Sequence, residues 1–190
     1  MADNHLKKIT GLHENINTEQ LDRWASFYSN IEARADDTWS SAEWLHFMLE
    51  GQQFVISTRS LDEVTTVSIG ASLPHLSSAT IGLVNLSGDV VLTFDLGQIL
   101  NLRSEIKPRP AQRLFLLKDD SDEKGQRSGF LVDQILSVIE INEADLQPFF
   151  DAEVDDKNNY IDAVIESESG QSISRINPRA LLDGIKEMLF

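Results

Sequence analysis

No cysteine occurs in this chain of 190 residues. Disulfides, thiolate nucleophiles and cysteine-based zinc sites are therefore excluded, and the absence fits a reducing compartment. Long hydrophobic runs are also missing, since a run such as Leu-Phe-Leu-Leu at residues 114–117 is far shorter than the ~20 apolar residues that span a bilayer. Residues 1–8 contain no apolar segment followed by a cleavage site, so we expect no secretory signal. These absences predict a cytoplasmic protein that does not insert into a membrane.

Basic residues are scarce. The chain has 16 Lys and Arg against 31 Asp and Glu, which gives a formal net charge of −15. Such a surface repels phosphate backbones and anionic lipids on average, and no basic cluster offsets it. We therefore expect no nucleic-acid partner. The acidic excess is typical of a soluble protein and does not by itself identify a partner.

Motifs for catalysis and cofactor binding are absent. There is no Gly-x-Ser-x-Gly nucleophile motif and neither of the common glycine-rich phosphate-binding motifs. An acidic run at residues 151–156 has Asp156 where a calcium loop needs its glycine. The histidines are too scattered for a zinc site; they are His5, His13, His46 and His75. We therefore expect no enzyme activity, no metal and no cofactor.

An amphipathic helical pattern occupies the first part of the chain. Thr18 is a candidate N-cap, and it is followed by residues at spacings of three and four: Leu21, Trp24, Tyr28, Ile31 and Ala35. This spacing places them on one helical face. We predict an N-terminal helical extension over residues 1–42 that packs on its own domain. Docking of this face onto a partner, including self-association as a dimer, remains an open alternative.

From Trp44 onward the pattern changes to short strands. Alternating or continuous apolar runs bounded by turn residues predict strands at residues 44–49, 53–56, 81–86, 90–96, 113–117, 128–132, 137–141, 160–165 and 172–176. The polar stretch at residues 118–127 is typical of an exposed hairpin loop. Many short strands with little helix favour a mainly β fold of barrel or sandwich type over alternating βαβ units.

Two short helical segments complete the pattern. Asn142 is a candidate N-cap for about one turn that stops at Pro148. Asn177 as N-cap and Pro178 at the first helical position predict a closing C-terminal helix. Its apolar residues share one face; they are Leu181, Leu182, Ile185, Met188 and Leu189.

The stretch at residues 81–96 is the most informative part of the chain. Two apolar runs flank a tight turn at Ser87, Gly88 and Asp89, which is typical of a β-hairpin. The hairpin resembles that of the CheW-like domain family, whose pattern is Gly-Val-x-Asn-Leu-Arg-Gly followed by an apolar strand that ends in Asp-Leu. The matching positions are Gly82, Leu83, Val84, Asn85, Leu86, Ser87 and Gly88, then Asp95 and Leu96.

The resemblance continues in order from about residue 43 to residue 183. It includes a first hairpin at residues 44–56, a Val-x-Glu-Ile-like segment at residues 61–64, and a strand ending in Val-Asp-x-Val at residues 129–135. Further matches are the helical turn at residues 142–148, the strand from Tyr160 and the closing Leu181-Leu182-Asp183.

The resemblance implies a fold and a function. The fold is mainly β, with two interleaved five-stranded SH3-like β-barrels over residues 43–190, closed by the C-terminal helix. The function is that of a non-catalytic adaptor which couples chemoreceptors to a CheA-like histidine kinase in chemotaxis or twitching motility. The helical extension is similar to one found in coupling proteins of type IV pilus chemosensory systems, the PilI-like subtype.

The resemblance also implies which residues contact partners. The kinase-facing candidates are Leu61, Glu63 and Val64, and the receptor groove would be surrounded by Asn85, Gly88, Gly129, Asp133, Ile135 and Val138. Each has a structural alternative, since the aliphatic residues can belong to the core and Gly88 can serve only its turn.

Two departures from the family pattern affect function. Ser87 stands where the family usually carries arginine, and serine lacks that residue's charge and fork of donors. Arg175-Ile176-Asn177-Pro178 replaces a more apolar strand end. An alternative function is therefore a divergent CheW-like module with exchanged partners, such as an inhibitor or a self-associating scaffold. A small enzyme or ligand-binding barrel is a third class.

Overall fold

The computed structural model describes residues 42–66, 77–86, 88–105, 111–119, 125–149, 160–166 and 170–189. The predicted extension lies outside these ranges except for Ala42, and Ser87 also lies outside them. The division of the chain at residues 42 and 43 therefore stays a prediction. The described residues from Ala42 onward belong to one compact unit.

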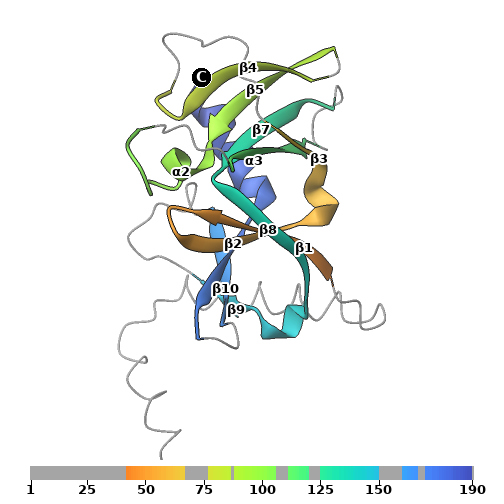
Figure 1. Ribbon diagram of the computed structural model, residues 1–190, viewed down its shortest axis with the longest axis vertical. Coiled ribbons are helices and arrows are strands. Elements are labelled where there is room, and N and C mark those ends of the chain that lie inside the picture. The colour runs from red at the N-terminus through yellow and green to blue at the C-terminus, as the bar shows by residue number, and fades with distance from the viewer. Residues whose placement is uncertain are drawn as a thin grey trace, which may run out of the picture. The chain divides into compact units, whose positions relative to one another are not determined.

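The first sheet is mixed and has the strand order β8-β1-β2-β11-β10-β9 (Figure 1). Its strands are β1 (Ala42–Leu49), β2 (Gln52–Ser57), β8 (Gln134–Ile141), β9 (Gln147–Pro148), β10 (Ile161–Glu166) and β11 (Ser172–Ile176). Neighbours run antiparallel except β11 and β2, which are parallel. The two-residue strand β9 makes six strands where five were expected.

The second sheet is also mixed and has the order β3-β6-β7-β5-β4. Its strands are β3 (Leu61–Thr66), β4 (Thr80–Leu86), β5 (Asp89–Asp95), β6 (Arg113–Lys118) and β7 (Arg127–Val132). The chain therefore starts in the six-stranded sheet, passes through the five-stranded sheet and returns at Asp133, which separates β7 from β8. This confirms a mainly β, interleaved arrangement, whereas closure of the sheets into barrels stays a prediction.

Three short helical elements lie between strands, and a longer helix follows the last strand. They are α2 (Leu96–Ile99), α3 (Pro178–Leu189) and the 3-10 turns η1 (Thr58–Ser60) and η2 (Glu143–Asp145). Two of the predicted N-caps are confirmed, since Asn142 accepts a hydrogen bond from the Ala144 N–H and Asn177 accepts from the Arg179 N–H. The third, Thr18, lies outside the described residues. Within the described ranges, no helix combines the length and the apolar character required to cross a membrane.

Two local expectations were wrong. Leu96 does not end the hairpin strand, because the Asp95 side chain accepts from the Gln98 N–H and starts helix α2. Lys118 and Arg127 do not belong to an exposed loop, because they pair with each other at the ends of β6 and β7. The loop between these two strands is therefore shorter than predicted.

The two sheets share one hydrophobic core. Phe47 of the six-stranded sheet packs on Phe115 of the five-stranded sheet with ring centroids 5.6 Å apart. Phe115 stacks on Phe130 at 5.6 Å, and Phe130 stacks on Phe94 at 5.9 Å. All four rings are fully buried. Such aromatic contacts bury large areas and stabilise both sheets at once.

Helix α3 closes this core. Its buried side chains are Leu181, Leu182 and Ile185, as the sequence predicted, and all three belong to the shared cluster. Gly184 allows the helix to approach buried Tyr160, because a Cβ at residue 184 would lie 2.5 Å from the Tyr160 hydroxyl oxygen. Burial also raises the pKa of Tyr160.

This close approach predicts the sign of a stability change. Helix propensity alone would make Gly184→Ala more stable by about 1 kcal/mol. We expect the variant to be less stable by about 1–3 kcal/mol, because the new methyl group overpacks the Tyr160 ring. Urea unfolding followed by circular dichroism measures the difference, and a stabilised variant would contradict the packing described here.

Candidate functional site

Strand β3 forms one edge of the five-stranded sheet and pairs with β6. Leu61 packs against the shared core, whereas Glu63 is exposed and the Val64 side chain is 42% exposed. The core alternative for Val64 is therefore wrong. The three kinase-facing candidates thus divide into one anchoring residue and two surface residues.

The hairpin turn uses Asn85 and Gly88 for its own geometry. Leu86 pairs with Asp89, so the loop contains only two residues. Gly88 has φ 99°, and its N–H donates to the Asn85 side-chain oxygen at 3.0 Å. Both residues are exposed. A left-handed glycine is the usual requirement of such a turn.

Gly129 is buried in the middle of β7. A Cβ at this position would lie 2.8 Å from the Thr93 side chain on β5 and 3.2 Å from Leu114 on β6. The residue therefore permits close packing between neighbouring strands, and its place at the groove stays a prediction.

Strand β8 forms an edge of the six-stranded sheet and pairs with β1. Ile135 packs against the shared core, while Val138 is 55% exposed. A β-bulge between His46 and Phe47 leaves Leu136 as the unpaired residue of β8, and Leu136 is 37% exposed. The sequence analysis did not select Leu136, because a bulge interrupts the alternation on which strand patterns depend.

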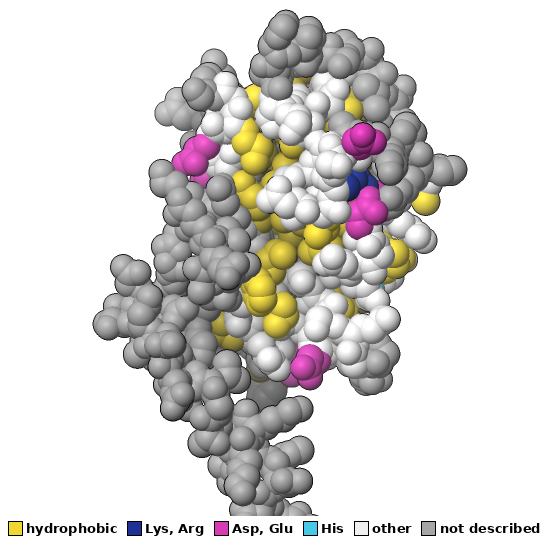
Figure 2. Space-filling model, turned by 90° about the vertical axis from the view of Figure 1, so that its left-hand side faces the viewer, with side chains coloured by type: hydrophobic (Ala, Val, Ile, Leu, Met, Phe, Trp, Pro, Cys, Tyr) yellow, Lys and Arg dark blue, Asp and Glu magenta, His cyan; other side chains and the backbone are white. Residues whose placement is uncertain are grey.

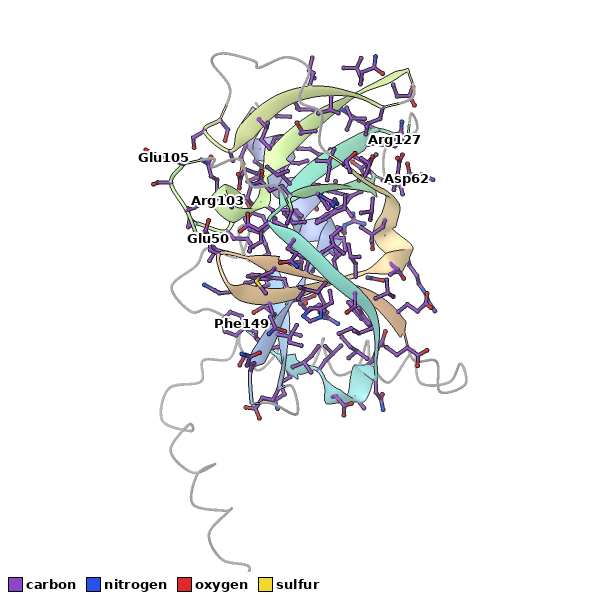
Figure 3. The ribbon with its side chains drawn as sticks, in the orientation of Figure 1. Glu50, Asp62, Arg103, Glu105, Arg127 and Phe149 are labelled. Carbon is purple, nitrogen blue, oxygen red and sulfur yellow. The ribbon has the colours of Figure 1, made fainter. Side chains whose placement is uncertain are left out.

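A cluster of ion pairs at Arg127 links strand β3 to the hairpin (Figure 3). The Arg127 guanidinium donates to Asp62 of β3 at 2.9 Å and to Asp89, the first residue of β5, at 2.5 Å. Lys118 contacts the other Asp62 oxygen at 3.0 Å. The cluster therefore joins Asp62, which lies between the candidates Leu61 and Glu63, to Asp89, which follows Gly88 in the turn. The sequence analysis missed it because it assigned Arg127 to a loop.

Asp133 belongs to a second, buried network centred on Arg103. The Arg103 guanidinium donates to Asp133 at 2.5 Å, to Asp95 at 2.8 Å and to Glu50 at 3.2 Å. Burial lowers the pKa of Arg103, but its hydrogen bonds to Asp133 and Asp95 outweigh that effect and raise the pKa above its ordinary value. Arg103 is therefore charged at physiological pH.

Within the residues that the structure describes, no group of three or more His, Asp or Glu side chains is placed to hold a metal ion. Figure 2 shows one face of the molecule, where hydrophobic side chains form a band and little of the described surface is Lys or Arg. Exposed apolar strands are the main candidates for recognition.

The comparisons with known proteins agree with this geometry. The model of the CheW-like domain family matches residues 43–186. The chain belongs to the CheW-like domain family. A similar solved structure is the crystal structure of the scaffolding protein TtCheW from Thermoanaerobacter tengcongensis, with a TM-score of 0.62. The two chains are 21% identical over 73% of this chain and 85% of that chain, a level that shows the fold alone. No curated protein matches the chain.

The family membership confirms the resemblance drawn from the hairpin. The residue assignments taken from that resemblance stay predictions, as does the PilI-like subtype. What the structure adds is that the kinase-facing candidates lie on β3, an edge strand of the five-stranded sheet, whereas the groove candidates are spread over the β4–β5 hairpin, β7, Asp133 and the edge strand β8.

The Arg127 cluster predicts how Asp62 titrates. Hydrogen bonds from Arg127 and Lys118 hold the pKa of Asp62 below its usual 3.8. Because the pKa is lower in the folded state, this carboxylate stabilises the fold above the unfolded-state pKa and loses that contribution as the pH falls through the folded-state pKa. In Arg127→Gln we expect the Asp62 pKa to rise but to stay below 3.8, because Lys118 remains.

An NMR titration of the Asp62 carboxyl carbon measures this shift. Arg179→Gln is the matched control, because it makes the same substitution at an arginine that contacts Asp183 of α3 instead of Asp62, and it should leave the Asp62 pKa unchanged. An Asp62 pKa that does not change in Arg127→Gln would show that the ion pair does not form in solution.

Proposed function

We propose that this protein is a non-catalytic adaptor that couples a chemoreceptor to a CheA-like histidine kinase. Membership of the CheW-like family, together with exposed apolar side chains on the edges of two sheets, supports this function. Val64 on β3 and Val138 on β8 are the clearest examples. The kinase regulatory domain binds at β3, and the receptor's cytoplasmic tip binds in the groove that the hairpin turn, Gly129, Asp133 and β8 surround.

Edge strands suit this task for a physical reason. Their outer N–H and C=O groups are available to a partner, and exposed valines supply apolar area that binding removes from water. Each interface needs only a standard area of about 1,200–2,000 Å² in total. Modest affinities suffice, because a receptor array presents many copies of each partner and multivalency multiplies the effective affinity.

Barrel closure, cellular location and the role of the N-terminal extension are proposed from the family resemblance. The two sheets close as five-stranded barrels, with β9 as an addition to the first. The protein acts in the cytoplasm in chemotaxis or twitching motility, and residues 1–42 form a helical extension that packs on its own domain, with self-association through the same face as the alternative.

Two single substitutions should separate the two partners. Val64→Glu should weaken binding of the kinase regulatory domain by at least about tenfold, because an interface would bury an unpaired carboxylate. Val138→Glu should do the same for the receptor tip. Each variant should retain its other partner, and isothermal titration calorimetry with the purified fragments measures all four affinities.

Phe149→Glu is the control for these variants. It also adds a carboxylate at an exposed apolar side chain, at 36% exposure, outside the candidate residues. If both valine variants bind both partners as tightly as Phe149→Glu does, the proposed surfaces are wrong. If the unaltered protein binds neither fragment, the adaptor function is wrong.

A second candidate function rests on Ser87. A CheW-like module that has exchanged its partners would no longer need arginine at this position. Under the adaptor proposal, Ser87→Arg should strengthen binding of a chemoreceptor tip by roughly tenfold, the value of one charge-assisted hydrogen bond. Ser87→Lys should gain less, because lysine lacks the planar fork. No change in either variant would favour the module with exchanged partners.

A further inference from the structure

The Arg103 network connects three separate parts of the fold. Asp95 ends β5 in the five-stranded sheet, Asp133 is the single residue between β7 and β8, and Glu50 lies in the turn between β1 and β2 of the six-stranded sheet. Arg103 contacts all three carboxylates while only 6% of its side chain is exposed. Figure 3 shows Arg103 above Glu50 at one side of the molecule. A single guanidinium thus joins the two sheets.

The same network holds a strained turn. Glu50 has φ 46° and Gly51 has φ 81°, so both residues of the β1–β2 turn are left-handed. This conformation favours glycine or asparagine at both positions, and glutamate adopts it at a cost of about 1–2 kcal/mol. The Glu50 N–H donates to Asp133 at 2.8 Å, and the Asp133 N–H donates to the Met48 carbonyl at 3.2 Å. A strained residue persists where several contacts fix it in this way.

The network also fixes the start of β8. Asp133 is bound on one carboxylate oxygen by Arg103 and on the other by the Glu50 backbone. Gln134 follows immediately, and Ile135 pairs with Phe47 of the shared core. Any movement of β8 relative to the five-stranded sheet must therefore change the Arg103 contacts.

Gly97 leaves room for the Arg103 side chain. The guanidinium lies over Gly97, where a Cβ would come within 2.8 Å of the Arg103 Nε atom. The Arg103 N–H donates to the Gly97 carbonyl at 3.3 Å, so backbone and side chain are both held. Among side chains, only a planar guanidinium can donate hydrogen bonds to carboxylates in three directions from such a confined position.

We infer that Arg103 is a positioning residue that couples the two partner surfaces, so that occupancy of β3 changes the affinity of β8 for its partner. The inference rests on the proposed function, and it adds the route by which one sheet senses the other. Arg127 joins Asp62 of β3 to Asp89 at the start of β5, and Arg103 binds Asp95 at the end of β5. A displacement at β3 therefore reaches Arg103 through β5, and Arg103 passes it to Glu50 and Asp133 at the start of β8. Coupling of this kind is a reciprocal free energy between two sites.

Two variants of the full-length protein test the coupling. Glu50→Gln removes a charge from the partly exposed end of the network and keeps the backbone N–H that binds Asp133. Arg103→Lys keeps the positive charge and loses the fork. Glu105→Gln is the matched control, because it makes the same charge change at an exposed residue two positions from Arg103.

The readout is the affinity of a soluble chemoreceptor-tip fragment, measured by calorimetry with and without a saturating CheA-type regulatory domain. We expect wild type and Glu105→Gln to show coupling within the usual range of about 5–150-fold. The coupling factor, which is the ratio of the receptor-tip affinities with and without the regulatory domain, should fall to near one in Glu50→Gln and Arg103→Lys. The affinity of each variant for the regulatory domain alone should stay within about twofold of the wild-type value, because β3 is remote from both substituted residues.

Each other outcome has a defined meaning. A coupling factor in Glu50→Gln that equals the wild-type value overturns the inference. A wild type that binds both fragments with a coupling factor of one also overturns the inference, but it leaves the adaptor function intact. A wild type that binds neither fragment overturns the proposed function itself. If Arg103→Lys fails to fold, amide hydrogen exchange of the wild-type protein is measured with and without the regulatory domain. Binding of that domain should change the exchange rates at Glu50 and residues 134–138, and unchanged rates there overturn the inference.

Discussion

A buried arginine shared by three carboxylates is the interaction on which the geometry of this fold depends. Arg103 takes its partners from the end of β5, from the β1–β2 turn and from the corner between β7 and β8. Removing one member of such a network leaves a buried charge without compensation, at a cost of about 3–5 kcal/mol. The network as a whole contributes less to net stability, because the desolvation of its charges offsets much of their attraction.

Stability and geometry therefore have different sources in this protein. The stacked rings of Phe94, Phe115 and Phe130, joined by Phe47, bury apolar area and favour the compact state without specifying one arrangement of the sheets. The Arg103 network is directional, so it selects one arrangement from those that the core allows. The proposed adaptor function requires both properties, since the core must keep the protein folded while the two partner surfaces are held in a defined arrangement.

The parts that could be predicted from the sequence were local. The caps at Asn142 and Asn177, the hairpin turn at Gly88 and most of the strands follow from residues that are neighbours in the chain. Strand β3 was not predicted, because its residues do not alternate between buried and exposed, and the family resemblance identified residues 61–64 only as a matching segment. The bulge at Leu136 likewise has no local signal.

The networks could not be predicted because their members are distant in sequence. Arg103 is 30 residues from Asp133 and 53 from Glu50, and Arg127 is 65 residues from Asp62. Charged residues at such separations show no period or spacing that identifies them as partners. Asp133 was selected because of its place in a family motif, and the reason for its importance is visible only in the fold, where it binds both Arg103 and the Glu50 backbone.

The central claim is that two partners occupy separate edges of one rigid body at the same time. Size-exclusion chromatography with light scattering, on a mixture of this protein, a CheA-type regulatory domain and a receptor-tip fragment, tests it most directly. The account predicts a complex whose mass includes all three components. Two binary complexes that replace each other as either partner is increased would contradict it.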